Sequence, residues 1–294
     1  MPSSATIPSY HGFHSFQFMD YRFNIVTRYL NDIGDTVRMR SEISLAMGIR
    51  LSAGHAVYFR DDGVLAIADL HLGYEAALQA EHVSIPRFQL EPMLERLSGL
   101  LKKFQPETVV INGDLKHEFS HNKSQEWDEI DTILDLLDGV DVVAVRGNHD
   151  NFLQTILARR DIRMVDSLEL AGGKFLLCHG HKEVESNDVF RIFAHEHPVI
   201  RMRDAVGAQI TLPCFLYDPE NRFLVMPAFS PLASGTNVLS PESSFMNPGL
   251  RGLDISGARV YAIHEGIMNF GKVSDLREMR DDAYQKRLKG KNTR

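Results

Sequence analysis

The sequence contains very little cysteine, since its 294 residues include only Cys178 and Cys214. Two cysteines cannot build a disulfide framework or a cysteine-rich zinc site, so we expect both to be packed thiols in a reducing compartment. Long apolar runs are lacking as well: no stretch approaches the ~18 residues that a bilayer crossing needs, and the first residues lack a signal-peptide pattern. We therefore expect a cytoplasmic protein without a membrane partner.

Positive charge is also in short supply. The chain has 32 Lys and Arg against 39 Asp and Glu, which gives a net charge of −7 and a pI near 6.0. This balance disfavours a general electrostatic grip on duplex nucleic acid, unless a local basic patch exists. A charged or metal-held small substrate fits better. A hydrophobic content of 44% can fill the core of one large α/β domain or of two small ones.

The two ends of the chain differ from its middle. Residues 1–48 lack a clear strand pattern, and we expect a loosely attached N-terminal extension that lies upstream of a true start at Met47. The main domain is expected to span residues 49–280. Residues 281–294 form a basic tail, which we expect to fray and which offers one site for a nucleic-acid contact.

Five short runs rich in Val, Ile and Leu stop abruptly at Asp, Asn or His. Their length and their polar or glycine boundaries are typical of buried strands. The runs are GVLAIADLH (63–71), TVVINGD (108–114), DVVAVRGNHD (141–150), KFLLCHGH (174–181) and VFRIFAHEH (189–197). Ligands bind at the carboxyl ends of strands in such sheets, where all five polar endings fall. More strand-like pieces follow residue 210, and we expect them to form a second sheet packed on the first.

Two segments between these runs have helical spacing. The first apolar stripe consists of Phe88, Met93, Leu94, Leu97, Leu100, Leu101 and Phe104, and Pro92 is tolerable only in the first turn. The second stripe consists of Trp127, Ile130, Ile133, Leu134 and Leu137. Asp128, Glu129, Asp131 and Asp135 are expected to form a solvated face opposite that stripe. Alternation of strands and helices predicts a layered α/β domain.

The polar endings of the five runs combine into the pattern of a metal centre. Asp69 and His71 are two residues apart, so strand geometry would point both side chains to one side and toward one cation. Asp114 follows a glycine, and a carboxylate can bridge two cations. Asn148 adds a neutral oxygen ligand, whereas His149, His179, His195 and His197 supply imidazoles. Each signal is weak by itself, but the combination predicts a coupled two-metal site.

In these motifs the chain resembles the calcineurin-like metallophosphoesterases. The family's ordered motifs are matched by Asp69-Leu70-His71, Gly113-Asp114, Gly147-Asn148-His149-Asp150, His179-Gly180-His181 and His195-Glu196-His197. DLHLGYE, GDLKHEF, VRGNHD and PAFSPLASGT are similar to segments of archaeal phosphoesterases related to the SbcD nuclease and of bacterial DNA-ligase-associated metallophosphoesterases. The resemblance implies a four-layer α/β-β/α sandwich.

The resemblance also implies a ligand set. Metal 1 would be held by Asp69, His71, Asp114 and His197, and metal 2 by Asp114, Asn148, His179 and His195. His149 would face the phosphate and the leaving group instead of binding metal. Ala194 departs from the family, which usually has Gly there, and because Ala tolerates positive φ poorly, ligation by His195 is the least secure assignment.

Each residue beside the motifs has two possible interpretations, a role at the site or an ordinary structural role. Asp150 could hold the imidazole of His149, while His181, His117 and Glu118 are candidates for orienting ligands or substrate, although a surface role would also explain them. Lys116 either meets phosphate or is an ordinary exposed lysine. His55, His82, His121 and His264 lack motif support and are expected to be structural.

The expected activity is hydrolysis of phosphate esters by a metal-bridged hydroxide, with His149 aiding the leaving oxygen. Oxygen and imidazole ligands suit Mn²⁺, Fe or Zn²⁺, and family likeness favours Mn²⁺. Residues 115–118 replace the Asp-Arg-Gly cluster of protein phosphatases, which disfavours that class. A phosphodiesterase is favoured, and a nuclease that acts on single-stranded nucleic acid is one form that it could take. A small-molecule phosphomonoesterase and a non-catalytic scaffold remain the alternatives, and the oligomeric state is open.

Overall fold

The computed structural model describes residues 39–118, 124–184, 188–203, 209–240 and 245–280. A first, seven-stranded sheet has the order β1-β2-β3-β4-β5-β6-β7. β4 to β7 run parallel, and the first four strands alternate in direction. The strands are β1 (Glu42–Ser44), β2 (Ile49–Ser52), β3 (Ala56–Phe59), β4 (Val64–Ile67), β5 (Thr108–Asn112), β6 (Asp141–Val145) and β7 (Arg163–Val165).

The first strand of this sheet lies in the segment that the sequence analysis assigned to the extension. β1 pairs antiparallel with β2, and the backbone of Arg40 bridges to Ile267 of the second sheet. Residues 39–48 therefore contribute to the folded domain. Residues 1–38 and the tail 281–294 lie outside the described residues.

A second sheet faces the first, with the order β15-β14-β12-β13-β10-β9-β8 and with β11 paired to β12. Its strands are β8 (Ser167–Leu170), β9 (Phe175–Cys178), β10 (Phe190–Phe193), β11 (Val199–Arg203), β12 (Gln209–Asp218), β13 (Phe223–Val225), β14 (Arg259–Ile263) and β15 (Ile267–Lys272). The runs at 174–181 and 189–197 supply β9 and β10, so the second sheet begins well before residue 210 and our expected boundary was wrong. Composition alone does not distinguish two buried parallel strands in one sheet from two in another.

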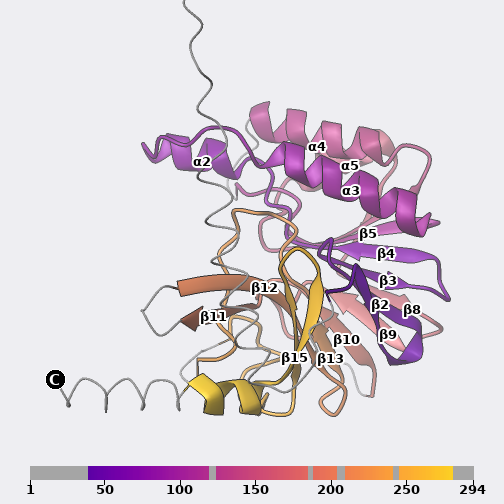
Figure 1. Cartoon of the computed structure of the whole chain (residues 1–294). Coiled ribbons are helices and arrows are strands. Elements are labelled where there is room, and N and C mark those ends of the chain that lie inside the picture. The colour runs from indigo at the N-terminus through magenta and orange to yellow at the C-terminus, as the bar shows by residue number, and fades with distance from the viewer. Residues whose placement is uncertain (1–38, 119–123, 185–187, 204–208, 241–244, 281–294) are drawn as a thin grey trace, which may run out of the picture.

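Helices cover the outer face of the first sheet (Figure 1). They are α2 (Tyr74–Ala80), α3 (Leu90–Phe104), α4 (Ser124–Leu136) and α5 (Leu153–Leu157), and short 3-10 helices occupy Ala46–Gly48 and Ala158–Arg160. Pro92 lies in the first turn of α3, as its lack of an N–H requires. Phe88 precedes that helix and is 44% exposed, so it does not belong to the apolar stripe. None of the helices in the described part of the chain has the length and apolar character of a membrane span.

Three apolar clusters separate four layers. One lies between the helices and the first sheet and includes Leu97, Ile111 and Ile133. The second, between the sheets, includes Val110 and Ile192. The third lines the outer face of the second sheet, and residues 245–258 and the helical segment 273–280 pack on it. Each buried aliphatic or aromatic side chain in these layers contributes roughly 1.5–3 kcal/mol. The predicted α/β sandwich is confirmed.

Candidate metal centre

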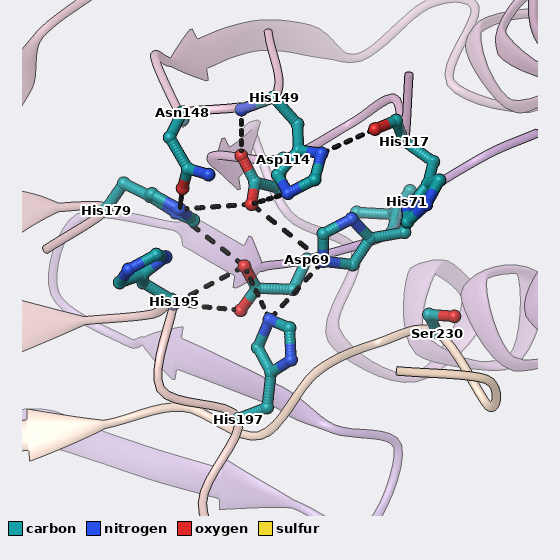
Figure 2. A network of polar contacts seen from close by, with 12 residues as sticks. Asp69, His71, Asp114, His117, Asn148, His149, His179, His195, His197 and Ser230 are labelled. Atoms are coloured by element: carbon teal, nitrogen blue, oxygen red, sulfur yellow. Dashed lines mark hydrogen bonds and ion pairs between the residues drawn. The ribbon is translucent and has the colours of Figure 1, made fainter. Parts of the chain in front are cut away.

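The polar segments that follow β4, β5, β6, β9 and β10 meet at one edge, where both sheets end (Figure 2). These segments carry all the side chains that the sequence analysis singled out as ligands. Asp69, His71, Asp114, Asn148, His179, His195 and His197 surround a common space, with His149 and His117 beside it. Residues up to 128 positions apart in the chain are thus brought into one site.

Asp69 and His71 lie beyond the end of β4, in a turn and not in the strand. Both have left-handed backbone, with φ of 56° and 47°. The turn runs alongside the one that carries Asp114, since the His71 N–H donates to the Asp114 carbonyl at 2.9 Å and the Asp69 N–H donates to the Gly113 carbonyl at 3.0 Å. The side chains converge because of this turn, so our argument from strand alternation was wrong.

Left-handed backbone recurs around the centre. Positive φ occurs at Asp69, His71, Asp114, His195 and His197, with values between 46° and 64°. Asp and His tolerate this region better than most residues, but each instance still costs about 1–3 kcal/mol. The packing of the two sheets must therefore hold these residues in place, which is typical of a functional site.

The first ligand cluster consists of Asp69, His71 and His197. The Asp69 carboxylate lies 3.2 Å from His197 Nε2, and the Nε2 atoms of His71 and His197 are 3.4 Å apart. The His197 ring is oriented from behind, because its Nδ1 donates to the Ser234 carbonyl at 2.8 Å. Such a bond from the second ring nitrogen is the usual way to aim a metal-binding imidazole.

The second ligand cluster consists of Asp114, His179 and His195. His179 Nε2 lies 3.3 Å from Asp114 Oδ2 and 3.1 Å from the side-chain oxygen of Asn148. Its other nitrogen donates to the Asn112 carbonyl at 3.1 Å. Asn148 therefore completes this group with a neutral oxygen.

Asp114 joins the two clusters through one oxygen. Its Oδ2 lies 3.3 Å from His179 Nε2 and 3.8 Å from His71 Nε2. Its Oδ1 points the other way and accepts the backbone N–H of His149 at 2.9 Å. A single carboxylate oxygen between two imidazole groups is a geometry suited to bridging two cations.

Burial and charge set the protonation of these groups. Burial alone would raise the pKa of Asp114, but His179, His71 and His149 hold it below its usual range. Burial would lower the pKa of His179, yet Asp114 and Asp69 raise it to about 9. Burial lowers the pKa of His71 to about 3 and that of His195 to about 4, so both keep a lone pair at neutral pH. Anionic carboxylates beside neutral imidazoles can bind a divalent cation, which would displace the His179 proton.

Ala194 does not adopt the backbone that its family position suggested. It is fully buried in the cluster between the sheets, and it is not among the positive-φ residues of the described chain. The left-handed conformation falls on His195 instead. Position 194 therefore does not need the conformational freedom of glycine, and its methyl group packs in the core between the sheets, while ligation by His195 stays a prediction.

We expected Asp150 to hold the His149 ring, but its carboxylate binds backbone groups instead. Its carboxylate accepts backbone N–H groups of Asp114, Leu115 and Gly147 at 2.9, 3.0 and 2.7 Å, and thus fixes the loop that carries the bridging carboxylate. The His149 ring is held by another group, since its Nδ1 lies 2.5 Å from the His117 carbonyl oxygen.

The remaining candidates, His117, His181 and Glu118, differ in their contacts with the centre. The His117 ring stacks on Tyr74 with centroids 3.9 Å apart and lies 5.5 Å from the His71 ring. His181 is near the second cluster, with its ring 5.3 Å from that of His179. Glu118 contributes backbone contacts: its N–H donates to Glu126 and its carbonyl accepts from the Lys116 ammonium.

Lys116 itself is fully buried and not an exposed lysine beside the phosphate. Its ammonium lies 4.0 Å from the Glu126 carboxylate, which is also buried. Glu129, which we placed on a solvated face, is only 6% exposed and accepts the Gly73 N–H at 2.8 Å. The apolar positions 130, 133 and 137 repeat at helical spacing from 126, and this signal could have located Glu126 on the buried face.

Gln89 is a site residue that the sequence analysis missed. Its buried amide donates to the carbonyls of Leu70 and His71 at 2.7 and 3.0 Å, and it lies 3.0 Å from Ser230 Oγ. It thus ties the turn of the first cluster to the loop after β13. No local pattern marks this position, because its partners are 18 to 141 residues away.

The residues that we expected to be structural lie away from the ligand clusters. His55 is buried, and its Nδ1 donates to the Ala228 carbonyl at 2.7 Å. His82 is exposed and His264 half-buried, while His121 lies outside the described residues. Cys178 and Cys214 are buried free thiols, as expected.

The calcineurin-like phosphoesterase family model matches residues 63–233, which include all the proposed ligands from Asp69 to His197. The chain belongs to this family, and it is a hydrolase that acts on phosphate esters.

A solved structure shares this fold. The nuclease MPE of Pseudomonas putida is similar with a TM-score of 0.58 and 24% identity, over 78% of this chain and 98% of that one. Yfce, a phosphoesterase from E. coli, gives a TM-score of 0.33 and 16% identity, over 67% of this chain and 87% of that one. No curated protein matches the chain at a significant level.

Proposed function

We propose that this protein is a two-metal phosphodiesterase that cleaves single-stranded nucleic acid. The observation that carries the proposal is the position of Asp114 Oδ2 between the Asp69–His71–His197 cluster and the His179–His195 cluster. One cation would be held by Asp69, His71, Asp114 and His197, and the other by Asp114, Asn148, His179 and His195.

The donor set fits a divalent transition metal. It combines carboxylate, amide and imidazole donors without a thiolate, which suits Mn²⁺, Fe or Zn²⁺, and we propose Mn²⁺. When bound, the two cations would lower the pKa of an attacking water and neutralise the phosphoryl oxygens.

The protein's own residues would orient and protonate the substrate. His149 Nε2 faces the centre, 3.9 Å from Asp114 Oδ2, while Nδ1 donates to the His117 carbonyl. That bond fixes the proton on Nδ1, so a second proton on Nε2 is aimed at the leaving oxygen. Such general acid assistance is typically worth ~10² to 10⁴ in rate. His117 and His181 lie on either side of the centre and are proposed to contact the substrate.

One observation argues against a protein substrate and another supports a nucleic-acid diester. Residues 115–118 are Leu-Lys-His-Glu, which replaces the Asp-Arg-Gly cluster of protein phosphatases. The structure named as a nuclease shares the fold over nearly its whole length. We place the protein in the subgroup similar to the SbcD-related and ligase-associated enzymes, and in the cytoplasm, where buried free thiols stay reduced.

The net charge of −7 favours the second candidate function, a small-molecule phosphomonoesterase. The test is a comparison of bis-p-nitrophenyl phosphate, p-nitrophenyl phosphate and labelled single-stranded and duplex oligonucleotides. Metal-free protein would be loaded with Mn²⁺, Zn²⁺, Fe²⁺ or Mg²⁺ in turn. Faster diester and single-strand cleavage with Mn²⁺ would support the proposal. Turnover of the monoester alone would refute it in favour of the second candidate.

A further inference from the structure

Helix α4 presents two buried carboxylates to the loops beside the metal centre. Glu126 and Glu129 are 1% and 6% exposed, one turn apart, although their neighbour Asp128 is exposed. A carboxylate is costly to bury unless hydrogen bonds and a countercharge compensate it. The partners of Glu126 therefore show what the carboxylate holds in place.

Glu126 holds the backbone of the loop after β5. Its Oε1 accepts the N–H groups of His117 and Glu118 at 3.2 and 2.7 Å. Its Oε2 makes no hydrogen bond to a described residue, but it lies 4.0 Å from the ammonium of the fully buried Lys116. Lys116 in turn donates to the Glu118 carbonyl. One ion pair thus fixes residues 116 to 118 from two sides.

The His117 carbonyl held in this way is the acceptor for His149. The distance from His149 Nδ1 to that oxygen is 2.5 Å, and the opposite nitrogen Nε2 faces Asp114 Oδ2 at 3.9 Å. The direction of the carbonyl therefore determines both the tautomer of the ring and the aim of Nε2 (Figure 2).

Close packing leaves Glu126 little freedom to move. A Cβ on Gly73, which has φ +80°, would lie 2.5 Å from Glu126 Cγ, so the turn before α2 rests directly on this side chain. The Gly73 N–H donates to Glu129 at 2.8 Å. The two acids of α4 thus hold different loops, and Glu126 holds the loop whose His117 carbonyl accepts from His149.

We propose that Glu126 is a positioning residue for His149, acting through the backbone of residues 117 and 118. The inference rests on the proposed function, because it assumes that His149 assists the leaving oxygen. A purely structural ion pair would affect all substrates equally. A positioning residue should matter most where the leaving group needs a proton.

The experiment compares Glu126→Ala, His149→Ala and the double variant on methyl p-nitrophenyl phosphate and methyl phenyl phosphate. Asp128→Asn, an exposed acid on the same helix, is the control. We expect the rate loss in Glu126→Ala and in His149→Ala to be at least about tenfold larger on the phenyl ester than on the p-nitrophenyl ester, because phenoxide is the more basic leaving group. The double variant should be no slower than His149→Ala, since both act through one group.

The inference would be overturned if Glu126→Ala lowered the rates on the two esters by the same factor, or if the rate losses of the two single variants multiplied in the double variant. The role of His149 would stand in either case. If His149→Ala itself shows no preference between the esters, the assignment of His149 fails, and this inference falls with it. The two failures are therefore distinguishable.

A spectroscopic readout tests the same point without turnover. In the Zn²⁺-loaded protein, the ¹⁵N shifts of His149 should report a proton on Nδ1, and Glu126→Ala should mix the tautomers. Unchanged shifts would contradict the inference. If thermal melting shows that Glu126→Ala does not fold, the same measurements are made on Glu126→Asp, whose carboxylate is shorter by one methylene and lies farther from the backbone of residues 117 and 118. A wild-type His149 tautomer and a wild-type preference between the two esters in Glu126→Asp would overturn the proposal.

Discussion

Gly147 lies directly against Asp114, so closely that a Cβ on the glycine would be 2.1 Å from Asp114 Oδ1 and 2.3 Å from its backbone nitrogen. Real Cβ contacts are not this short, so any side chain at 147 must displace the loop that carries the bridging carboxylate. The glycine is thus part of the geometry of the centre and not only of the turn.

Gly147→Ala should therefore impair metal binding and activity together. Moving the catalytic geometry by about 1 Å can cost on the order of 10² in rate. Metal stoichiometry by elemental analysis and turnover of a diester would measure the effect. Gly99→Ala is the matched control: apart from its chain neighbours and the backbone of its own helix, no described atom lies within 4 Å of a Cβ at this exposed α3 position, and the helix should gain about 0.5–1 kcal/mol. Wild-type metal content and rate in Gly147→Ala would contradict the prediction.

Asp114→Asn should weaken binding of both cations. The substitution keeps the shape but removes the negative charge that faces His71 and His179. We expect at least about tenfold weaker Mn²⁺ affinity by calorimetry and at least a tenfold fall in turnover, an effect typical of changes at metal sites. Asp128→Asn makes the same change on the surface and should leave both unchanged. Retained binding of two cations in Asp114→Asn would refute the bridging role.

His149→Ala should lower turnover at least tenfold while two cations still bind, because His149 is assigned to the leaving oxygen and not to a metal. Its ring lies 4.9 Å from that of His71, so only calorimetry can separate a catalytic loss from a loss of ligand. A variant that binds a single cation would show that His149 is a ligand.

Stability should fall in acid because of His55. Burial, mainly, and Arg96 lower its pKa from 6.5 to about 3. The unfolded chain therefore binds a proton at His55 between these values that the folded chain does not, so the contribution of His55 to the free energy of unfolding is full above pH 6.5 and is lost as the pH falls toward 3. The slope approaches about 1.4 kcal/mol per pH unit.

His55→Asn should flatten this decrease, since Asn tolerates the φ of 58° at this position and does not titrate. Denaturant unfolding of the chelator-treated protein at several pH values provides the measurement. His82→Asn changes an exposed histidine with a similar φ of 65° and should leave the slope as in the wild type. An unchanged slope in His55→Asn would contradict the assignment.

A chain that begins at Met47 should be less stable than one that begins at Met39. The shorter chain lacks β1, including the ion pair from Glu42 to Lys103 at 3.0 Å and the hydrogen bonds between Arg40 and Ile267 at 3.3 and 2.8 Å. Each kcal/mol lost lowers the melting temperature of a domain this size by about 2–4 °C. Equal melting temperatures would show that β1 is dispensable and would support Met47 as a sufficient start.

Local patterns alone determined much of this protein. The stripe from Met93 to Phe104 follows from the geometry of a single helix, and the runs that end at Asp114 and Asn148 follow from the length and composition of buried strands. The order of the polar endings was sufficient to indicate the family and the residue types of the centre. Such features depend on neighbours a few positions away, so they are legible in one sequence.

Tertiary packing decided the rest. Contacts between distant strands determine whether β9 pairs within the first or the second sheet. Distant contacts also determine that Asp150 accepts backbone N–H groups, and that the His117 carbonyl, not Asp150, binds the His149 ring. The burial of Lys116 with Glu126 is compensated by partners that only the folded loops provide. Side-chain chemistry is encoded locally, but a charged group's partner, and hence its role, is fixed by packing across the whole chain.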